Sequence, residues 1–426
     1  MSTAAPARAT SRTRTRREAH TFRGNLRSTR HGWLRLTPAY SVRLVGELLG
    51  SRSAAGPVLD PFSGTGTTLL ACSEHGIDAE AVDINPFLVW LARTKVQRYT
   101  PAQLAEARSG LLRMRRAVLR GRRSGWVPPL HQIEKWWSPH TLAALSRAHA
   151  ALGQVAAEAS RPATDLLNIA FCQVLIARSR AHFGHQSMSF QPASDAAEPD
   201  DGSTPDDVSA VADGLKEAFE RVAAAAAIDL PATSRRVLHG DARRLHEVLP
   251  AEHYGAVITS PPYANRMSYI RELRPYMYWL GYLEERSAAG VLDWKAIGGT
   301  WGSATSNLSS WSPASAEQEL PALPSGLAPR LRAIAEQSPL LSTYVHKYFH
   351  DMALHIASLY RVLRRGGSAW FVVGNSKFYD VVVPVEQLLA EQFEAAGFRD
   401  LSVETLRKRS SKKELYEYLV RATKPA

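Results

Sequence analysis

One pentapeptide, Thr259–Tyr263, combines residue types that could grip a planar base. Its sequence is Thr-Ser-Pro-Pro-Tyr, and it ends the apolar, strand-like run that begins at Ala256. Two consecutive prolines fix φ and remove two N–H donors, so the loop is rigid and presents its carbonyl groups. Tyr263 adds a flat face on which a base rotated out of a duplex could stack. A turn of this composition has no particular function in general. The Thr259–Tyr263 turn differs because it directly follows a strand that is expected to be buried.

The chemistry that suits this loop is transfer of a methyl group to an exocyclic amino group. Such an amine is a poor nucleophile because its lone pair is delocalised into the ring. Hydrogen bonds from its protons to the Ser260 hydroxyl and the Pro261 carbonyl would favour a pyramidal nitrogen and aim the lone pair at a methyl donor. We therefore predict that Ser260, Pro261, Pro262 and Tyr263 are the catalytic residues.

A second cluster, Asp60–Thr68, has the pattern of a cofactor-binding turn. Its sequence, Asp-Pro-Phe-Ser-Gly-Thr-Gly-Thr-Thr, places a Gly-x-Gly turn between a short apolar strand and a helix. Glycine lets the backbone approach a ligand, and a helix N-terminus offers free N–H groups. Asp83 ends the next expected strand, 23 residues after Asp60, where a carboxylate can accept hydrogen bonds from ribose hydroxyls. The third glycine of dinucleotide sites and the Gly-Lys-Ser/Thr of P-loops are both missing.

Together the two clusters resemble the motifs of amino-methylating DNA methyltransferases, the N4-cytosine and N6-adenine class. The resemblance spans roughly 30–96, 236–282 and 343–423. It implies S-adenosyl-L-methionine as cofactor, double-stranded DNA with a flipped base as substrate, and a role for His31–Tyr40 in closing over the methionine end. It also places Asp241 beside the adenine ring. The predicted cofactor-binding residues are Asp60, Phe62, Gly64, Gly66, Thr67, Asp83, Asp241 and Ala242.

The residue at position 260 bears on the target base. In the resembled family, serine there is typical of N4-cytosine enzymes and aspartate or asparagine of N6-adenine enzymes. We therefore predict cytosine N4 and keep adenine N6 as the alternative. Methylation of ring carbon 5 needs a nucleophilic cysteine, usually after a proline, and neither Cys72 nor Cys172 fits. Both cysteines lie in helix-like sequence and are expected to be buried as small apolar residues.

Two further functions remain open at this stage. RNA methyltransferases that act on a guanine amino group share a similar glycine loop and a Pro-Pro-Tyr-like motif, although no added RNA-binding domain is recognisable in this sequence. A non-catalytic nucleic-acid-binding protein on the same scaffold is disfavoured by the intact motifs. The sequence leaves open the recognised site, the oligomeric state, and whether a restriction or phage-defence partner exists.

Basic residues indicate where nucleic acid could be contacted. Residues 1–50 contain ten arginines, no lysine and two acids, and so carry most of the net charge of +12. Arginines on such an arm commonly pair with phosphates and release counterions, although a solvated tail would have the same composition. Two later segments could also contact DNA. The one after the catalytic loop could equally be an ordinary surface helix, and the one at 407–413 could equally be a solvated hairpin tip. The predicted nucleic-acid contacts are Asn265, Arg266, Arg271 and Arg409.

Strands that alternate with helices predict an α/β fold. We expect a Rossmann-like class I methyltransferase domain, with a mostly parallel seven-stranded sheet, an antiparallel terminal hairpin and helical insertions. The expected strands lie at 58–59, 79–84, 236–241, 256–259, 369–374, 401–406 and 415–420. The expected division is a disordered basic arm (1–30), a catalytic domain in three parts (31–99, 231–284 and 341–426), a helical insertion (100–230) and an irregular insertion that could read the target (285–340).

The composition sets limits on other classes of function. Hydrophobic residues make up 45% and charged residues 22% of the chain, which is typical of a globular protein. No run approaches the roughly 18 uncharged apolar residues of a membrane span, and the N-terminus lacks the apolar segment of a secretory signal, so a cytoplasmic location is expected. The histidines and the two cysteines show no metal-ligand spacing, so no metal is expected.

Overall fold

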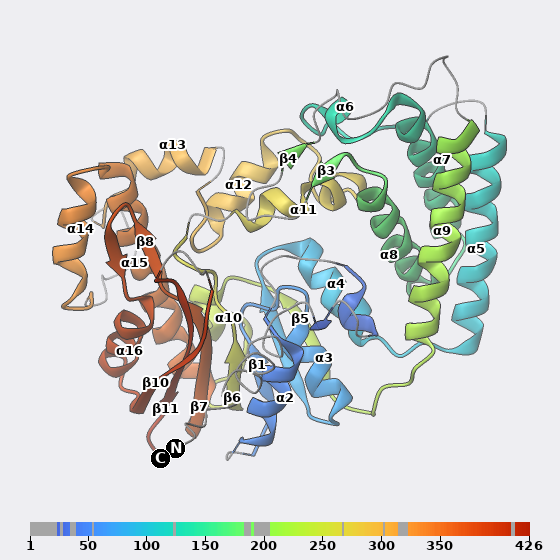
Figure 1. The fold of residues 1–426 in the computed structure, drawn as a ribbon. Helices are drawn as coiled ribbons and strands as arrows, with labels where there is room; N and C mark the ends of the chain where they lie inside the picture. Colours follow the sequence, from blue (N-terminus) through green and yellow to red (C-terminus); the bar gives the residue numbers. More distant parts are fainter. Residues whose placement is uncertain are drawn as a thin grey trace, which may run out of the picture.

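The computed structural model describes residues 24–25, 29–34, 40–52, 55–121, 125–182, 189–190, 205–265, 268–300, 303–313, 323–409 and 414–426. The predicted contact Arg266, most of the expected basic arm at 1–30 and positions 35–39 of the His31–Tyr40 segment lie outside these residues. The centre of the molecule is a seven-stranded sheet (Figure 1).

The sheet has the strand order β10-β11-β7-β6-β1-β2-β5. Its strands are β1 (Val58–Asp60), β2 (Ala79–Asp83), β5 (Arg235–His239), β6 (Tyr254–Thr259), β7 (Leu363–Gly374), β10 (Arg399–Lys408) and β11 (Tyr416–Thr423). The five strands from β7 to the edge strand β5 pair in parallel, whereas β11 is antiparallel to both of its neighbours, β7 and β10. The predicted fold class, a Rossmann-like class I topology with an antiparallel terminal hairpin, is therefore confirmed.

Successive strand residues face opposite sides of the sheet, as the two-residue period of a strand requires. Val58 and Ala256 pack in one core with α2, α3 and α4, and Leu59 and Val257 pack in the other with α15 and α16. These helices are α2 (Val42–Gly50), α3 (Thr67–Glu74), α4 (Pro86–Val96), α15 (Pro339–Val362) and α16 (Val385–Ala395). Because both faces are covered, the strands read as short apolar runs in the sequence.

A group of helices stands to one side of the sheet (Figure 1). It contains α5 (Pro101–Arg120), α6 (Ile133–Trp136), α7 (Pro139–Ala156), α8 (Arg161–Ala177) and α9 (Pro205–Ala226), and a short hairpin of β3 (Ala181–His182) and β4 (Ser189–Phe190). Helix α5 begins with a capping box between Thr100 and Gln103. These helices share one hydrophobic core with α4 and with α11 (Tyr269–Trp279), and the fully buried Trp279 packs edge-on against Trp137 and Phe171.

The sequence-based expectation of irregular structure at 285–340 is wrong for the part that the structure describes. That part contains α12 (Ala288–Lys295), α13 (Ser303–Ser310) and α14 (Leu327–Ala335). The helices form because a few apolar residues in this Ser/Ala-rich sequence become buried, among them Leu308, Leu327 and Ile334. The composition of this segment does not indicate these helices, because its apolar residues are too sparse to form a clear helical pattern.

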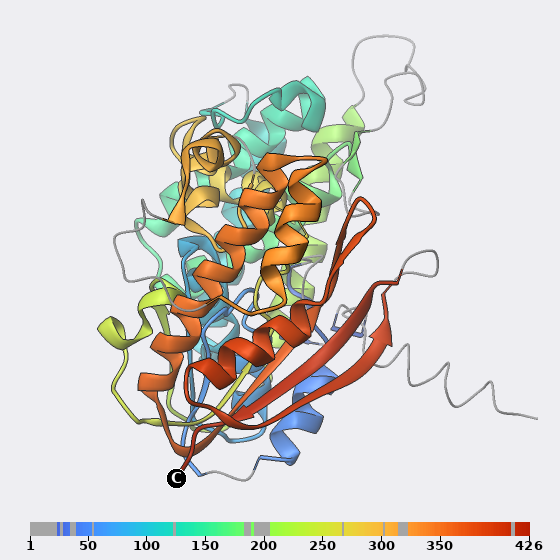
Figure 2. The ribbon, with the colours of Figure 1, turned by 90° about the vertical axis from the view of Figure 1, so that its left-hand side faces the viewer.

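Two segments between the expected elements also differ from the prediction. The strand expected at 369–374 is longer, since β7 begins at Leu363 and contains a register shift opposite Tyr254 and Ala256. Gly366, with φ of +70°, makes this irregularity possible. Residues 376–383 hold a second short hairpin, β8 (Ser376–Phe378) and β9 (Val381–Val383), which the sequence did not suggest. The 90° view in Figure 2 shows it beside the long terminal hairpin.

A single buried arginine connects the helical group to the catalytic sheet. Arg30 is 2% exposed and donates hydrogen bonds to five backbone carbonyls. Two of these carbonyls, of Lys95 and Gln97, end α4, and three, of Ala225, Ala226 and Ile228, end α9. The last carbonyls of a helix have no intrahelical partner, so this guanidinium satisfies the ends of two helices at once.

Replacing Arg30 should therefore destabilise the whole fold. We predict that Arg30→Met, which keeps the aliphatic stem, lowers the free energy of unfolding by about 2–4 kcal/mol, because several buried carbonyls lose their donor. Arg98→Met is the control: Arg98 is about half exposed and pairs with the exposed Asp229, so its loss should lower the free energy of unfolding far less. Denaturant unfolding followed by circular dichroism measures both. Equal losses of unfolding free energy in the two variants would contradict this role of Arg30.

Candidate active site

The two motif-bearing loops meet because their strands are parallel neighbours. β1 pairs with β6 in the register Val58↔Ala256 and Leu59↔Val257, so Asp60 and Thr259 end at the same edge of the sheet. The Thr259 hydroxyl donates a hydrogen bond of 2.6 Å to Asp60 Oδ1. The glycine turn and the Ser-Pro-Pro-Tyr loop are therefore fixed to one another at the carboxyl ends of adjacent strands, where open α/β sheets bind ligands.

The glycine turn has the backbone that its sequence predicts. Gly64 and Gly66 have φ of +50° and +76°, in the left-handed region that favours glycine. A Cβ on Gly66 would lie 2.9 Å from the Cβ of Ala92 in α4, so the turn packs directly against that helix. A Cβ on Gly64 would meet only the Phe62 carbonyl oxygen, at 3.7 Å, so the space above this residue is open. Thr67 is buried at the first position of α3.

The two acidic residues of the predicted cofactor site lie at the ends of β1 and β2. Asp60 Oδ1 accepts from the Phe62 amide as well as from Thr259, and Oδ2 is buried with no hydrogen-bond partner among the described residues. Burial raises the pKa of Asp60 to about 6, although these donors favour its charged form. Asp83 accepts one hydrogen bond each from the amides of Gly64 and Asn85. Burial raises its pKa to about 7 against the effect of those amides.

The predicted residues Phe62, Asp241 and Ala242 converge at the other side of the turn. Phe62 packs edge-on against His355 of α15, with 4.7 Å between ring centroids. His355 Nδ1 donates a hydrogen bond of 2.8 Å to the Ala242 carbonyl, and Nε2 is buried without a partner among the described residues. Burial lowers the pKa of His355 to about 4, so the ring is neutral at pH 7. No sequence motif marks His355, which lies 113 residues from Ala242.

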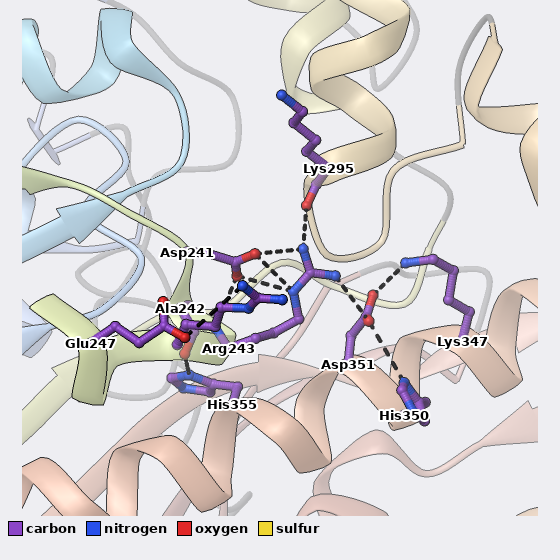
Figure 3. A network of polar contacts seen from close by, with 10 residues as sticks. Asp241, Ala242, Arg243, Glu247, Lys295, Lys347, His350, Asp351 and His355 are labelled. Carbon is purple, nitrogen blue, oxygen red and sulfur yellow. Dashed lines mark hydrogen bonds and ion pairs between the residues drawn. The ribbon is translucent and has the colours of Figure 1, made fainter. Parts of the chain in front are cut away.

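Asp241 takes part in an ionic network that sequence reasoning also missed (Figure 3). Its carboxylate is bidentate to Arg243, with a shortest distance of 2.7 Å, and Arg243 also donates to Asp351 and to the Lys295 carbonyl at the end of α12. Lys347 donates to the other oxygen of Asp351 at 2.6 Å. Arg243 therefore holds both oxygens of Asp241, and the placement of Asp241 beside an adenine ring stays a prediction.

The catalytic loop is braced from three elements. Ser260 Oγ donates a hydrogen bond of 2.9 Å to the Val372 carbonyl in β7. Tyr348 of α15 donates to the Pro262 carbonyl at 2.9 Å, and the Tyr263 amide donates to the Tyr269 hydroxyl of α11 at 3.1 Å. The Pro261 carbonyl receives no hydrogen bond from the described residues. The loop thus presents one carbonyl and one hydroxyl oxygen on a backbone that is held in place.

Three of the predicted nucleic-acid contacts lie near this loop. The Asn265 amide donates to the Tyr263 carbonyl, and Arg271 is partly buried in the first turn of α11. The guanidinium of Arg409 lies 4.9 Å from the Tyr263 ring centroid and donates to the Asn375 carbonyl. Contact of these residues with DNA stays a prediction. Arg407 and Lys408, expected in the hairpin turn, belong instead to β10.

The two cysteines and two adjacent tryptophans lie in the hydrophobic interior. Cys72 and Cys172 are free and buried, as predicted, and Trp136 and Trp137 are buried packing residues. No group of His, Cys, Asp and Glu side chains with the arrangement of a metal site is present among the described residues.

Comparison with known proteins gives a near full-length relative. The type II methyltransferase M.AvaI of Nostoc sp. is 22% identical over 404 residues, which cover 90% of this chain and 82% of M.AvaI. M.AvaI of Anabaena variabilis matches with the same values. The chain is therefore similar to type II methyltransferases over most of its length.

Other comparisons add less to this assignment. The type II methyltransferase M.MjaII of Methanocaldococcus jannaschii is 48% identical to this chain over 42 residues, which cover 10% of this chain. Among solved structures, the rRNA methyltransferase aviRa of Streptomyces viridochromogenes covers 90% of the chain and 86% of its own, at 13% identity and a TM-score of 0.26. No family model matches the sequence. Within the described residues of this chain, no helix has the length and apolar character that crossing a membrane requires.

Alanine at the second glycine of the turn should damage this site and the fold. We predict that Gly66→Ala lowers the free energy of unfolding by about 2–4 kcal/mol, because its positive φ strains alanine and its Cβ would press on Ala92. Gly46→Ala in α2 is the matched control, since its Cβ would meet nothing within 4 Å and alanine favours a helix interior by about 1 kcal/mol. Denaturant unfolding should give opposite signs, and two variants of equal stability would refute this packing.

Proposed function

We propose that this methyltransferase transfers a methyl group from S-adenosylmethionine to the exocyclic amino group of a base in DNA, with N4 of cytosine as the target. The observation that carries the proposal is the hydrogen bond from Ser260 Oγ to the Val372 carbonyl. Because the hydroxyl has one hydrogen and that hydrogen is engaged, the lone pairs of Oγ can only accept. Beside it stands the Pro261 carbonyl, also an acceptor. Two acceptors suit a group with two N–H bonds.

The proposed reaction needs no covalent bond to the protein. S-adenosylmethionine supplies an electrophilic methyl group on a sulfonium. Ser260 Oγ and the Pro261 carbonyl would each accept a hydrogen bond from the amine, so that its nitrogen lone pair points away from the ring plane. The nitrogen would gain the methyl group as the sulfur–methyl bond breaks, which turns the sulfonium into a neutral thioether, and the nitrogen would lose one proton. Neither a serine hydroxyl nor an amide carbonyl is a base at neutral pH, so we assign that proton to water.

The residues around the glycine turn fit this cofactor. The unpartnered Oδ2 of Asp60 would accept from the ammonium of its amino-acid part, which would satisfy a buried acceptor. A carboxylate has about four acceptor sites, and Asp83 uses two of them for amides, so it can still accept from ribose hydroxyls. The open space above Gly64 leaves room beside the turn. Phe62, Asp241 and Ala242 would lie at the adenine end.

DNA as the substrate rests on different grounds. The relatives that cover most of the chain are named as type II methyltransferases, and the Asp60–Thr68 and Ser260–Tyr263 motifs resemble those of DNA amino-methyltransferases. We include a restriction-modification setting in the proposal for the same reason. The choice of cytosine N4 over adenine N6 rests on serine at position 260.

A transfer assay with labelled cofactor tests the proposal. We predict that the purified protein labels duplex DNA and not tRNA, and that nucleoside analysis finds the label in N4-methylcytosine. Ser260→Ala should lower the rate by about 10- to 100-fold, because one hydrogen bond that orients the amine is lost. Ser309→Ala, an exposed serine of α13, is the control and should change nothing. Label in N6-methyladenine would correct the base, and label only in tRNA would overturn the proposal.

Cofactor affinity should depend on pH. The pKa values of Asp60 and Asp83, raised to about 6 and about 7 by burial, mean that both carboxyls lose their protons between pH 5 and 8. An ammonium and two hydroxyls favour the charged forms, so calorimetry should show affinity falling about tenfold from pH 8 to pH 5.5. The free protein should show the opposite trend, its unfolding free energy falling as pH rises through these pKa values.

Two variants separate the contributions to this pH dependence. Asp60→Asn should weaken binding and flatten the dependence near pH 6, because an amide there does not titrate. Asp380→Asn, with a nearly fully exposed side chain, should leave the pH profile unchanged. An affinity that does not vary between pH 5.5 and 8 would contradict the placement of the two carboxylates.

A further inference from the structure

The hydroxyl of Tyr263 is anchored on a residue of the terminal hairpin. It donates a hydrogen bond of 2.9 Å to Glu417 Oε1 in β11, across 154 residues of sequence. Glu417 is 6% exposed and pairs with Gly374 of β7 in the sheet. The hairpin, drawn in the red tones of the C-terminal part, forms the edge of the sheet (Figure 2). The catalytic loop and this edge are therefore joined by a side-chain contact.

Glu417 is itself held by an arginine of the neighbouring strand. Arg407 of β10 lies opposite Glu417 and donates to both of its oxygens, from Nε at 2.7 Å and from Nη2 at 3.2 Å. A two-pronged pair of this kind fixes the orientation of the carboxylate. Because an ionised carboxylate only accepts, the Tyr263 hydroxyl must donate to it. The hydroxyl proton is thus engaged away from the loop, which leaves the ring as the functional part of Tyr263.

The position of the ring is restricted from a second direction. The Arg409 guanidinium covers the Tyr263 ring at 4.9 Å and is tied to the Asn375 carbonyl at 3.1 Å. Gly374 allows both groups to approach β7, since a Cβ there would lie 2.3 Å from Arg409 Nη1 and 2.9 Å from Tyr263 Cε2. The ring is therefore held by its hydroxyl at one end and by a cation over its plane.

We propose that Glu417 is a positioning residue that orients the ring of Tyr263 for stacking on the target base, and that Arg407 fixes Glu417 for this task. The proposal rests on the proposed function, because it assumes that Tyr263 stacks on the base that is methylated. It also gives the basic hairpin a second role. Arg407 and Arg409 belong to the segment for which the sequence left DNA contact and a solvated hairpin tip both open. Here they act within the protein and set the plane of an aromatic ring 144 and 146 residues earlier in the chain.

A double-mutant cycle on methyl transfer tests this role. Glu417→Ala should lower kcat about tenfold, while the affinity for S-adenosylmethionine, measured by calorimetry without turnover, stays within about twofold. Tyr263→Phe should lower kcat by a similar factor, because it removes the same hydrogen bond and keeps the ring. In the double variant the second substitution should add less than about twofold, since each change removes one shared contact. Glu417→Gln keeps an acceptor oxygen and should recover most of the rate.

The control is a carboxylate on the same hairpin with no contact to the loop. Glu404 of β10 is exposed and pairs with Arg421 at 3.4 Å, so Glu404→Ala should leave kcat unchanged. Effects of Glu417→Ala and Tyr263→Phe that multiply in the double variant, or an unchanged kcat in Glu417→Ala, would overturn the inference and leave the proposed function intact. A wild-type protein that transfers no methyl group to DNA would overturn the proposed function first, and the inference with it.

Discussion

The parallel pairing of β1 with β6 is the constraint on which the candidate site depends. It brings the ends of two strands that are 199 residues apart in sequence to one edge of the sheet, where Thr259 bonds to Asp60. A shift of this register by one residue would turn every side chain of β6 to the other face and separate the two loops. The bond also sets the electrostatics, because it occupies one oxygen of a buried carboxylate and leaves the other available for a cationic group.

The rest of the molecule holds these two loops from outside the sheet. Helix α11 follows the catalytic loop and packs into the core of the helical group, while Arg30 connects that group to the end of α4. Helix α15 contributes Tyr348 to the Pro262 carbonyl and His355 to the Ala242 carbonyl, so one long helix touches both the Ser-Pro-Pro-Tyr loop and the segment after β5. The helices between β2 and β5 support the Ser-Pro-Pro-Tyr loop indirectly, because α11, which follows that loop, packs into their core.

The sequence predicted those parts whose signals are local. The inner strands β1 and β6 are short apolar runs, and the glycines and prolines of the two loops determine the backbone that those loops adopt. The helices α12 to α14 were missed because they bury few apolar residues. His355, Arg243 and Glu417 were missed for another reason. Each acts on a residue that only the folded sheet brings near, and an isolated glutamate in a β-strand has no pattern of its own.

The central claim is that acceptors at Ser260 and Pro261 direct methyl transfer to a base amino group in DNA. Single-molecule sequencing of DNA from a host that expresses the protein tests it most directly, since it reports the modified base and its sequence context together. The account predicts N4-methylcytosine at one recurring site with the wild type, and a much smaller modified fraction of that site with Ser260→Ala. Methylation that persists undiminished with Ser260→Ala, or a wild type that leaves host DNA unmodified, would contradict it.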